Sequence, residues 1–212
     1  MIPKELIEKN AVSYPEIFKI DLKKDPFPWF LLSVLFGARI SENIAKNTFF
    51  IFKSENLLSP EALIDRGWDG IVAVLDTGGY VRYDFKTATK ILELSENVIR
   101  EGGLNKIHEK SKDFDDLVRR LKSLAKGIGD VTVGIFMREM VGVWEKARPY
   151  PSKNVIVAAE NLGIDLFSYG DINYGRLEYF LMKIGKNCIK GNCDKCIVKE
   201  YCKRWNLNIN KQ

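Results

Sequence analysis

The chain has 212 residues, 46% of them hydrophobic, so it is long enough to bury a core in one or two domains. Its 33 Lys and Arg against 28 Asp and Glu give a formal charge of +5, which is compatible with a polyanionic partner without proving one. The charged N-terminus and the shortness of the longest apolar run predict no signal peptide, no membrane partner and a cytoplasmic location.

Nearly every segment has helical rather than alternating periodicity, so we predict an all-α protein. A short amphipathic segment at the N-terminus is expected to end near Tyr14 and Pro15. Pro26 or Pro28 then opens a helix. The apolar residues from 27 to 36 run all round this helix, which is typical of a core helix.

Ser41 is expected to cap the next helix, because a serine hydroxyl accepts a hydrogen bond from the first free backbone N–H groups. Trp68 and Trp144 are assigned to the core. Further helices are predicted at residues 60–66, 70–75 and 86–100.

A glycine turn between two helices is predicted at residues 127–129, within LAKGIGDVTVGIF, and Asp130 or Thr132 opens the second helix. The two glycines expose consecutive backbone N–H groups beside the positive end of a helix dipole. Such a turn suits a phosphate or a cation-bridged phosphate. Ile128 between them would pin the hairpin to the core. An ordinary helix C-cap followed by a new helix is the alternative for an isolated turn, but here a basic helix precedes it.

Four cysteines lie in the last 25 residues, with four, two and five residues between them: Cys188, Cys193, Cys196 and Cys202. A single compact metal or iron–sulfur loop explains them better than scattered thiols. Zinc accepts four sulfurs, but its structural sites usually come as two separated cysteine pairs. Disulfides suit small secreted domains that cannot build a core. The spacing therefore favours a cubane-type iron–sulfur cluster over zinc, and both over disulfides.

Four stretches, in this order, resemble the endonuclease III superfamily of base-excision DNA glycosylases: PFPWFLLSVLFGARISE, TGGYVRYDFKTATKI, LAKGIGDVTVGIF and the cysteine loop. The similarity covers about residues 25–202, and the first interval of the cysteine loop is two residues shorter than the family's. The resemblance implies two helical domains with a DNA-binding cleft between them. These are a six-helix barrel at 25–143 with its helix–hairpin–helix at about 114–142, and an iron–sulfur cluster domain made of 1–24 and 144–212 with the cluster loop at 188–202.

The resemblance also implies a 4Fe-4S cluster and a double-stranded DNA partner carrying a damaged or mismatched base. A nucleoid-associated monomer would flip this base and hydrolyse its N-glycosidic bond. Val131 stands where bifunctional members carry a lysine nucleophile, so we expect a monofunctional enzyme without lyase activity. The alternatives are a catalytically inactive relative that binds DNA lesions and, more distantly, a zinc-containing helical DNA-binding protein.

The family's catalytic aspartate is also missing. Its position in PSKNVIVAAENLGI falls on Ser152, or on Pro149 in an ungapped alignment. A monofunctional enzyme still needs a group that stabilises the developing sugar cation or positions water. Glu42 and Asp84 are secondary candidates for this group. The principal candidate catalytic residues are Ser152, Asp130, Glu139 and Lys153.

Contacts to DNA are expected from two loops, the hairpin and the cysteine loop. In the family, one side chain from each of two loops fills the space that a flipped base leaves in the duplex. The resemblance places Arg39 at the first of these positions and Tyr80 or Val81 at the second. The other expected contacts are backbone or cationic groups that meet phosphates: Gly127, Ile128, Gly129, Arg82, Lys126, Lys190 and Lys195.

Overall fold

The computed structural model of the protein describes residues 2–168 and 170–209. Within these ranges the chain forms twelve α-helices and one short 3-10 helix, and the only β pairing is an isolated bridge between Val141 and Trp144. The prediction of an all-α protein is confirmed. None of the helices in these ranges combines the length and the apolar content that a bilayer span requires.

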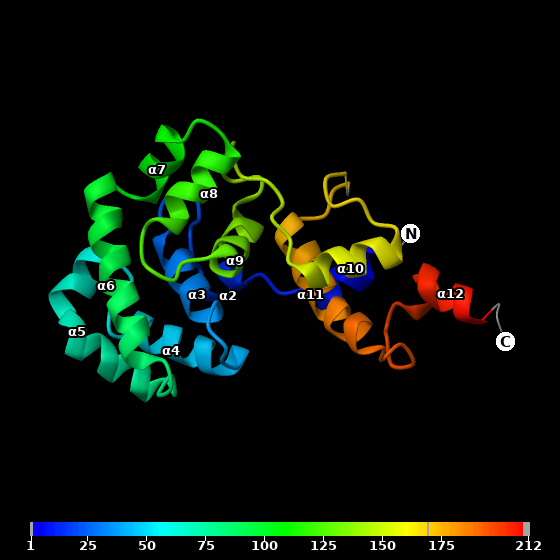
Figure 1. Ribbon diagram of the computed structural model, residues 1–212, viewed down its shortest axis with the longest axis horizontal. Helices are drawn as coiled ribbons and strands as arrows, with labels where there is room; N and C mark the ends of the chain where they lie inside the picture. Colours follow the sequence, from blue (N-terminus) through cyan, green and yellow to red (C-terminus); the bar gives the residue numbers. More distant parts are fainter. Residues whose placement is uncertain (1, 169, 210–212) are drawn as a thin grey trace.

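One group of helices surrounds the larger hydrophobic core and lies on the left of Figure 1. Its central helix is α3 (Phe27–Phe36), which packs on α4 and α9 and buries nine of its ten residues. This confirms the prediction of a core helix. The group also contains α2 (Tyr14–Phe18), α4 (Glu42–Ser54), α5 (Pro60–Thr77), α6 (Asp84–Glu101), α7 (Leu104–Lys110), α8 (Phe114–Lys122) and α9 (Asp130–Met140).

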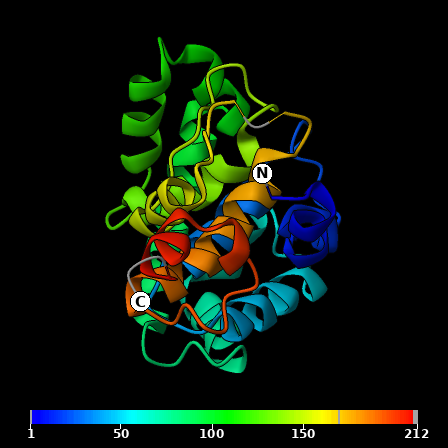
Figure 2. The same cartoon turned by 90° about the vertical axis from the view of Figure 1, so that its right-hand side faces the viewer.

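A second group of helices surrounds a smaller core on the right of Figure 1, and it faces the viewer in Figure 2. The chain crosses between the groups twice, before α2 and after α9, so the first helix belongs with the last ones. The groups meet where α11 packs against α9. The second group contains α1 (Lys4–Asn10), α10 (Lys153–Leu162), α11 (Tyr174–Lys190), the 3-10 helix at Lys199–Tyr201 and α12 (Lys203–Ile209).

Most predicted helix boundaries are found close to their expected places. The Ser41 hydroxyl caps α4 by accepting the N–H of Ile44 at 3.2 Å. The two segments predicted at 60–66 and 70–75 are the halves of α5, which kinks at Gly67 because this residue has φ +72°. The prediction for the N-terminus is wrong in one respect. Tyr14 and Pro15 do not end a helix but begin α2. Pro15 is tolerated there because the N–H groups of the first helical turn have no partner within the helix.

The two tryptophans assigned to the core have different environments. Trp144 is buried, as predicted. The prediction for Trp68 is wrong, because its side chain is 38% exposed. Its indole N–H donates to the hydroxyl of Thr89 at 3.0 Å, and its ring packs beside Phe85 on α6. The polar edge of the indole explains why this residue tolerates the surface.

A glycine lets α10 and α11 approach each other closely. A Cβ atom on Gly185 would lie 1.9 Å from the backbone oxygen of Asn154, which is far inside contact distance. The two helices pack along each other and supply most of the smaller core. Any side chain at this position therefore has to push the two backbones apart.

We predict that Gly185→Ala lowers the free energy of unfolding by about 1–3 kcal/mol because of this overpacking. Helix propensity alone would raise it by about 1 kcal/mol, so the sign of the change separates the two effects. Urea denaturation measures it. Gly70→Ala is the control, because Gly70 also lies inside a helix, α5, and only the flexible side chain of Arg66 approaches the new Cβ. If both variants match the parent in stability, the helices do not approach each other as described.

Candidate active site

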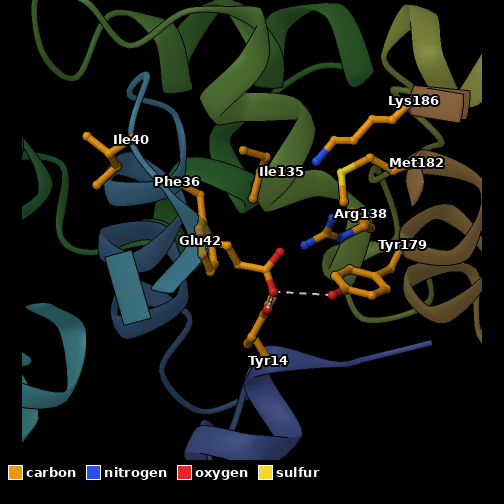
Figure 3. A pocket seen from close by; sticks show the side chains of 9 residues that line it. All are labelled: Tyr14, Phe36, Ile40, Glu42, Ile135, Arg138, Tyr179, Met182 and Lys186. Carbon is orange, nitrogen blue, oxygen red and sulfur yellow. Dashed lines mark hydrogen bonds between the residues drawn. The ribbon is translucent and has the colours of Figure 1, made fainter. Parts of the chain in front are cut away.

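A cavity of about 150 Å³ lies where the two groups of helices meet, and Figure 3 shows its lining. Side chains from α2, α3, α4, α9 and α11 surround it, so both groups contribute. Most of its walls are apolar or aromatic, and a few polar groups point inward, as in pockets that bind small molecules. The lining residues are Tyr14, Phe36, Ile40, Glu42, Ile135, Arg138, Tyr179, Met182 and Lys186.

Glu42, at the start of α4, is the acidic group of this cavity. The hydroxyl of Tyr14 donates a hydrogen bond to its Oε1, and the hydroxyl of Tyr179 donates to the same oxygen at 3.3 Å. Burial opposes ionisation, but the bond from Tyr14 and the charges of Lys183 and Lys46 lower the pKa of the carboxyl group. Glu42 is therefore ionised at neutral pH.

Arg138 reaches the cavity from α9, although its side chain is only 4% exposed. Its guanidinium carbon lies 5.7 Å from the ring centres of both Trp29 and Tyr179, distances at which the rings attract a cation. Its Nε lies 3.5 Å from Oε1 of Glu139, and this buried nitrogen has no hydrogen-bond partner among the described residues. A buried donor without a partner is unfavourable, so a water or a ligand is expected to complete it.

Two buried carboxyl groups accompany Arg138, one from each helix of the junction. Glu139 lies beside it on α9, and its Oε2 accepts a hydrogen bond from the hydroxyl of Ser13 at 3.1 Å. Glu178 lies on α11. Burial raises the pKa of both groups, and raises that of Glu178 to about 7, although the charge of Arg138 acts in the opposite direction.

Asp130 and Glu139, two of the candidate catalytic residues, have different environments. Asp130 begins α9, and hydrogen bonds from Lys122 and then Tyr150 lower the pKa of its exposed carboxyl group. It does not cap the helix, because Gly129 is the N-cap residue. Glu139 is buried and does not line the cavity, but it lies beside Arg138, which does.

Ser152 and Lys153 are exposed at the start of α10. Ser152 is the N-cap residue, but its hydroxyl forms no capping hydrogen bond and stays available. The chain on both sides of them packs against α9 and α11, the two helices that supply most of the cavity lining. The backbone of Tyr150 lies against Gly134, next to Ile135 in the cavity wall, and the backbone of Asn154 lies against Gly185, next to Lys186. Ser152 and Lys153 therefore lie between the segments that contact α9 and α11, but they do not line the cavity.

The predicted turn between two helices is present after α8. Gly127 has φ +88°, a left-handed conformation that favours glycine, and Ile128 is buried in the larger core as predicted. Gly129 is the extended residue before α9, and Lys126 is exposed beside the turn. The turn precedes the first residue of α9, Asp130, and Arg138 follows Asp130 by eight residues on the same helix. At 1.5 Å per residue, the two positions are about 12 Å apart along the helix axis.

Of the loop residues expected to replace a flipped base, Tyr80 is placed differently. Its side chain is fully buried, and its hydroxyl donates to the carbonyl oxygen of Leu35 at 2.7 Å. The ring cannot stack on a base from this position, so this prediction is corrected. Val81 is 65% exposed, and Arg82 beside it is exposed as well. Arg39 is exposed in the loop after α3, next to Ile40 in the cavity wall.

The four cysteines line one small cavity of about 20 Å³ after α11, and all of them are free thiols. Burial raises the pKa of the Cys188 thiol, and the other three thiols raise it further, so four thiolates need a cation to coexist here. No group of three or more His, Cys, Asp or Glu side chains within the described ranges has the arrangement of a site for one metal ion. Lys190 and Lys195 are exposed on the same loop.

Arg138, Tyr14 and Tyr179 belong to the site but were not predicted from the sequence. One signal for Arg138 was present, since it and Glu139 are the only charges inside the otherwise apolar segment VTVGIFMREM. Charged residues are rarely fully buried unless they are paired, so such a pair in a core helix indicates a special position. Tyr14 and Tyr179 lie 165 residues apart and carried no such signal.

The sequence was compared with models of known protein families and with curated proteins, and no match was found.

The raised pKa of Glu178 predicts that part of the stability is lost as the pH rises. An unfolded glutamate titrates near about 4.3, whereas the folded Glu178 titrates at about 7. The folded state holds the proton more tightly, so this contribution is complete below about pH 4.3 and is lost as the pH passes 7. Glu178→Gln removes the titration, and we expect it to be more stable than the parent at pH 8 by about 3 kcal/mol.

Urea denaturation of both proteins at pH 4.5, 6 and 8 measures this difference. The comparison cancels the other titrating groups, including Glu139 and the tyrosines around Arg138. A difference that stays constant over this pH range would mean that Glu178 is not protonated in the folded state.

Proposed function

We propose that the protein is a monofunctional DNA glycosylase that flips a damaged or mismatched base from a duplex and hydrolyses its N-glycosidic bond. The observation that carries this proposal is the cavity at the junction of the two groups of helices. It is small, largely apolar, and contains an ionised carboxylate and a guanidinium group. A flipped base needs a pocket of this kind, with polar groups placed at its edges.

In this proposal the two groups of helices are the six-helix barrel domain and the iron–sulfur domain, and DNA binds in a cleft between them. The two hydrophobic cores support such a division, as does the place of α1 beside α11. Helix α2 packs with the larger core, so the barrel domain would begin before residue 25.

The turn at 127–129 would bind the phosphate backbone at the start of α9, where the positive end of the helix dipole adds to its N–H groups. Lys126 is exposed beside it, and Arg82 follows the exposed Val81. Arg39 and Val81 would enter the space left by the flipped base, while Lys190 and Lys195 would meet phosphates from the cysteine loop.

The chemistry would need two kinds of group, one that stabilises the departing base and one that positions the water attacking C1′ of the sugar. The bond between C1′ and the base nitrogen breaks, and its electron pair leaves with the base. Arg138 and Lys186 in the cavity would stabilise this charge. A water held by the free hydroxyl of Ser152 adds to C1′, and its proton passes to solvent. Val131 is 64% exposed where an amine would be needed for an imine, so no lyase step is proposed.

For the cysteine loop we propose a 4Fe-4S cluster held by Cys188, Cys193, Cys196 and Cys202. Four sulfurs around one cavity, without a histidine, form the soft donor set that such clusters use. The cluster would brace the loop that carries Lys190 and Lys195.

A second possible function is that of a lesion-binding protein without catalysis. It is favoured by Ser152, which stands where the family carries its catalytic aspartate. Such a protein would use the same turn and the same cavity, and would hold a flipped base without cleaving its bond.

The test of glycosylase activity uses duplexes that carry uracil, hypoxanthine, oxidised guanine or alkylated purines, followed by alkali. We expect an alkali-labile site on at least one of them. Ser152→Ala should lower the single-turnover rate about 100-fold, because water is no longer positioned. Ser54→Ala, an exposed serine at the end of α4, is the control and should keep the rate. No labile site on any duplex, together with lesion-selective binding, would favour the non-catalytic function.

Anaerobic reconstitution with iron and sulfide should give a brown protein with a broad visible absorption band. Cys193→Ser and Cys196→Ser should each reduce the bound iron strongly, because a serine hydroxyl is a poor ligand for iron in a cluster. Metal analysis of the parent measures iron and zinc together. A colourless protein with one equivalent of zinc would contradict the cluster.

A further inference from the structure

We infer that a second cavity, formed by α6, α7 and α8, binds a phosphate monoester, which is a phosphate group with one carbon substituent. The cavity has a volume of about 290 Å³, and none of its residues lines the cavity at the junction of the two groups of helices. Three arginines in its wall would hold the phosphate, namely Arg100, Arg119 and Arg120. This inference does not depend on the proposed glycosylase function.

The three arginines come from the last turns of two helices. Arg100 lies in the last turn of α6, whereas Arg119 and Arg120 lie in that of α8. Helix α7 packs against both of these helices, and the three lie together on the left of Figure 1. Asn97 of α6 donates a side-chain N–H to the carbonyl oxygen of Leu124, just after α8, at 2.9 Å. The fold therefore holds the two helix ends together and places three guanidinium groups around one space.

Asp116 fixes two of these arginines without lining the cavity itself. Both side chains donate to its carboxylate, and Nε of Arg120 does so at 3.0 Å. A hydrogen bond from the backbone N–H of Lys112 and those from the arginines lower the pKa of Asp116 to about 2, so this carboxylate is ionised at neutral pH. A guanidinium group has five N–H donors, so Arg119 and Arg120 keep others free for a ligand.

The charges around the cavity leave an excess of two positive charges. Glu101 also lines the cavity, but its carboxylate is paired with Lys110 at 3.2 Å. Asp116 balances only one of the two arginines that it binds, and Arg100 has no ion pair among the described residues.

This excess matches a phosphate monoester better than a phosphate of the DNA backbone. A monoester carries about 1.5 to 2 negative charges at pH 7, whereas each backbone phosphate is a diester with about one. Guanidinium groups also bind phosphate oxygens in pairs, which a cluster of three of them allows from more than one side.

The helix dipoles alone do not explain this arrangement. A cation near the C-terminal end of a helix is favourable, which accounts for arginines in the last turns of α6 and α8. It does not account for their lining of one cavity, where like charges repel each other. Solvent screens this repulsion less at Arg120, whose side chain is 32% exposed, than at Arg119, whose side chain is 71% exposed. An anion between them would remove the repulsion.

Titration with two small probes tests the preference for a monoester. Methyl phosphate is a monoester and dimethyl phosphate is a diester, and the side-chain Nε–Hε resonances of the arginines report contact in NMR spectra. Methyl phosphate should shift the resonances of Arg100, Arg119 and Arg120, and should bind at least about fivefold more tightly than dimethyl phosphate because of its second charge. Equal affinity for the two probes, or no shift of these resonances, would overturn the inference.

Variants test the assignment to the arginines. Arg100→Gln removes an uncompensated charge without breaking an ion pair, and Arg119→Gln removes a second guanidinium group. Each should weaken the binding of methyl phosphate at least about fivefold. Arg66→Gln is the matched control, because Arg66 is exposed on α5, pairs with Glu55 and does not line the cavity. Thermal unfolding shows whether each variant is folded. A control that loses as much affinity as Arg100→Gln would mean that the net charge of the protein, not this cavity, attracts the probe.

The monoester can come from a free small molecule or from the 5′ end of a DNA strand, and oligonucleotides with a 5′-phosphate or a 5′-hydroxyl group separate these sources. For a strand end, the 5′-phosphate should raise the affinity at least about fivefold, and Arg100→Gln should remove this gain. For a free molecule, the two oligonucleotides should bind equally, while thymidine 5′-monophosphate shifts the same arginine resonances as methyl phosphate. A thymidine 5′-monophosphate that binds no better than thymidine, with equal binding of the two oligonucleotides, would count against the site.

Discussion

The buried guanidinium of Arg138 is the group on which the junction of the two cores depends. Helix α9 places Val133, Phe136 and Met137 in the larger core, while Arg138 lies on the side of the helix that meets α11. Two carboxyl groups accompany this cation, Glu139 from α9 and Glu178 from α11, and its charge favours their ionisation while burial opposes it. Because one carboxyl group comes from each helix, the packing of the two groups and the compensation of this charge occur together.

This arrangement is unfavourable for stability. Removing a cation and two carboxyl groups from water opposes folding, and an apolar junction of the same size would often be more stable. Several buried polar atoms at this junction have no hydrogen-bond partner among the described residues. Sites that bind ligands commonly retain such groups, since a strained or incomplete site gains most from its ligand. A ligand that completes these hydrogen bonds would offset part of this cost.

The fold was predictable from the sequence to a greater extent than the site. Periodicity and proline and serine signals are local, so they located α3, the Ser41 cap and the turn before α9 within a few residues. Burial depends on distant partners, and the errors reflect this. Trp68 follows the kink at Gly67 and packs beside the exposed Phe85 instead of the core, and buried Tyr80 finds a carbonyl acceptor at Leu35 of α3. The cavity joins residues from Tyr14 to Lys186, and no sequence pattern links positions so far apart.

Helix α9 connects the two proposed activities of this protein, the holding of a DNA strand and the reading of a base. Its first residue follows the glycine turn, and Arg138 lies near its other end, in the cavity wall. A helix is rigid over this length, so a phosphate bound at the turn would fix the distance between the strand and the guanidinium. In the proposed reaction, Ser152 stands where the family carries a carboxylate, so stabilisation on the sugar side would be weak and more of it would have to come from groups around the base. In such an enzyme the pocket that chooses the base would also supply most of the catalysis, so selectivity and rate would change together when Arg138 changes.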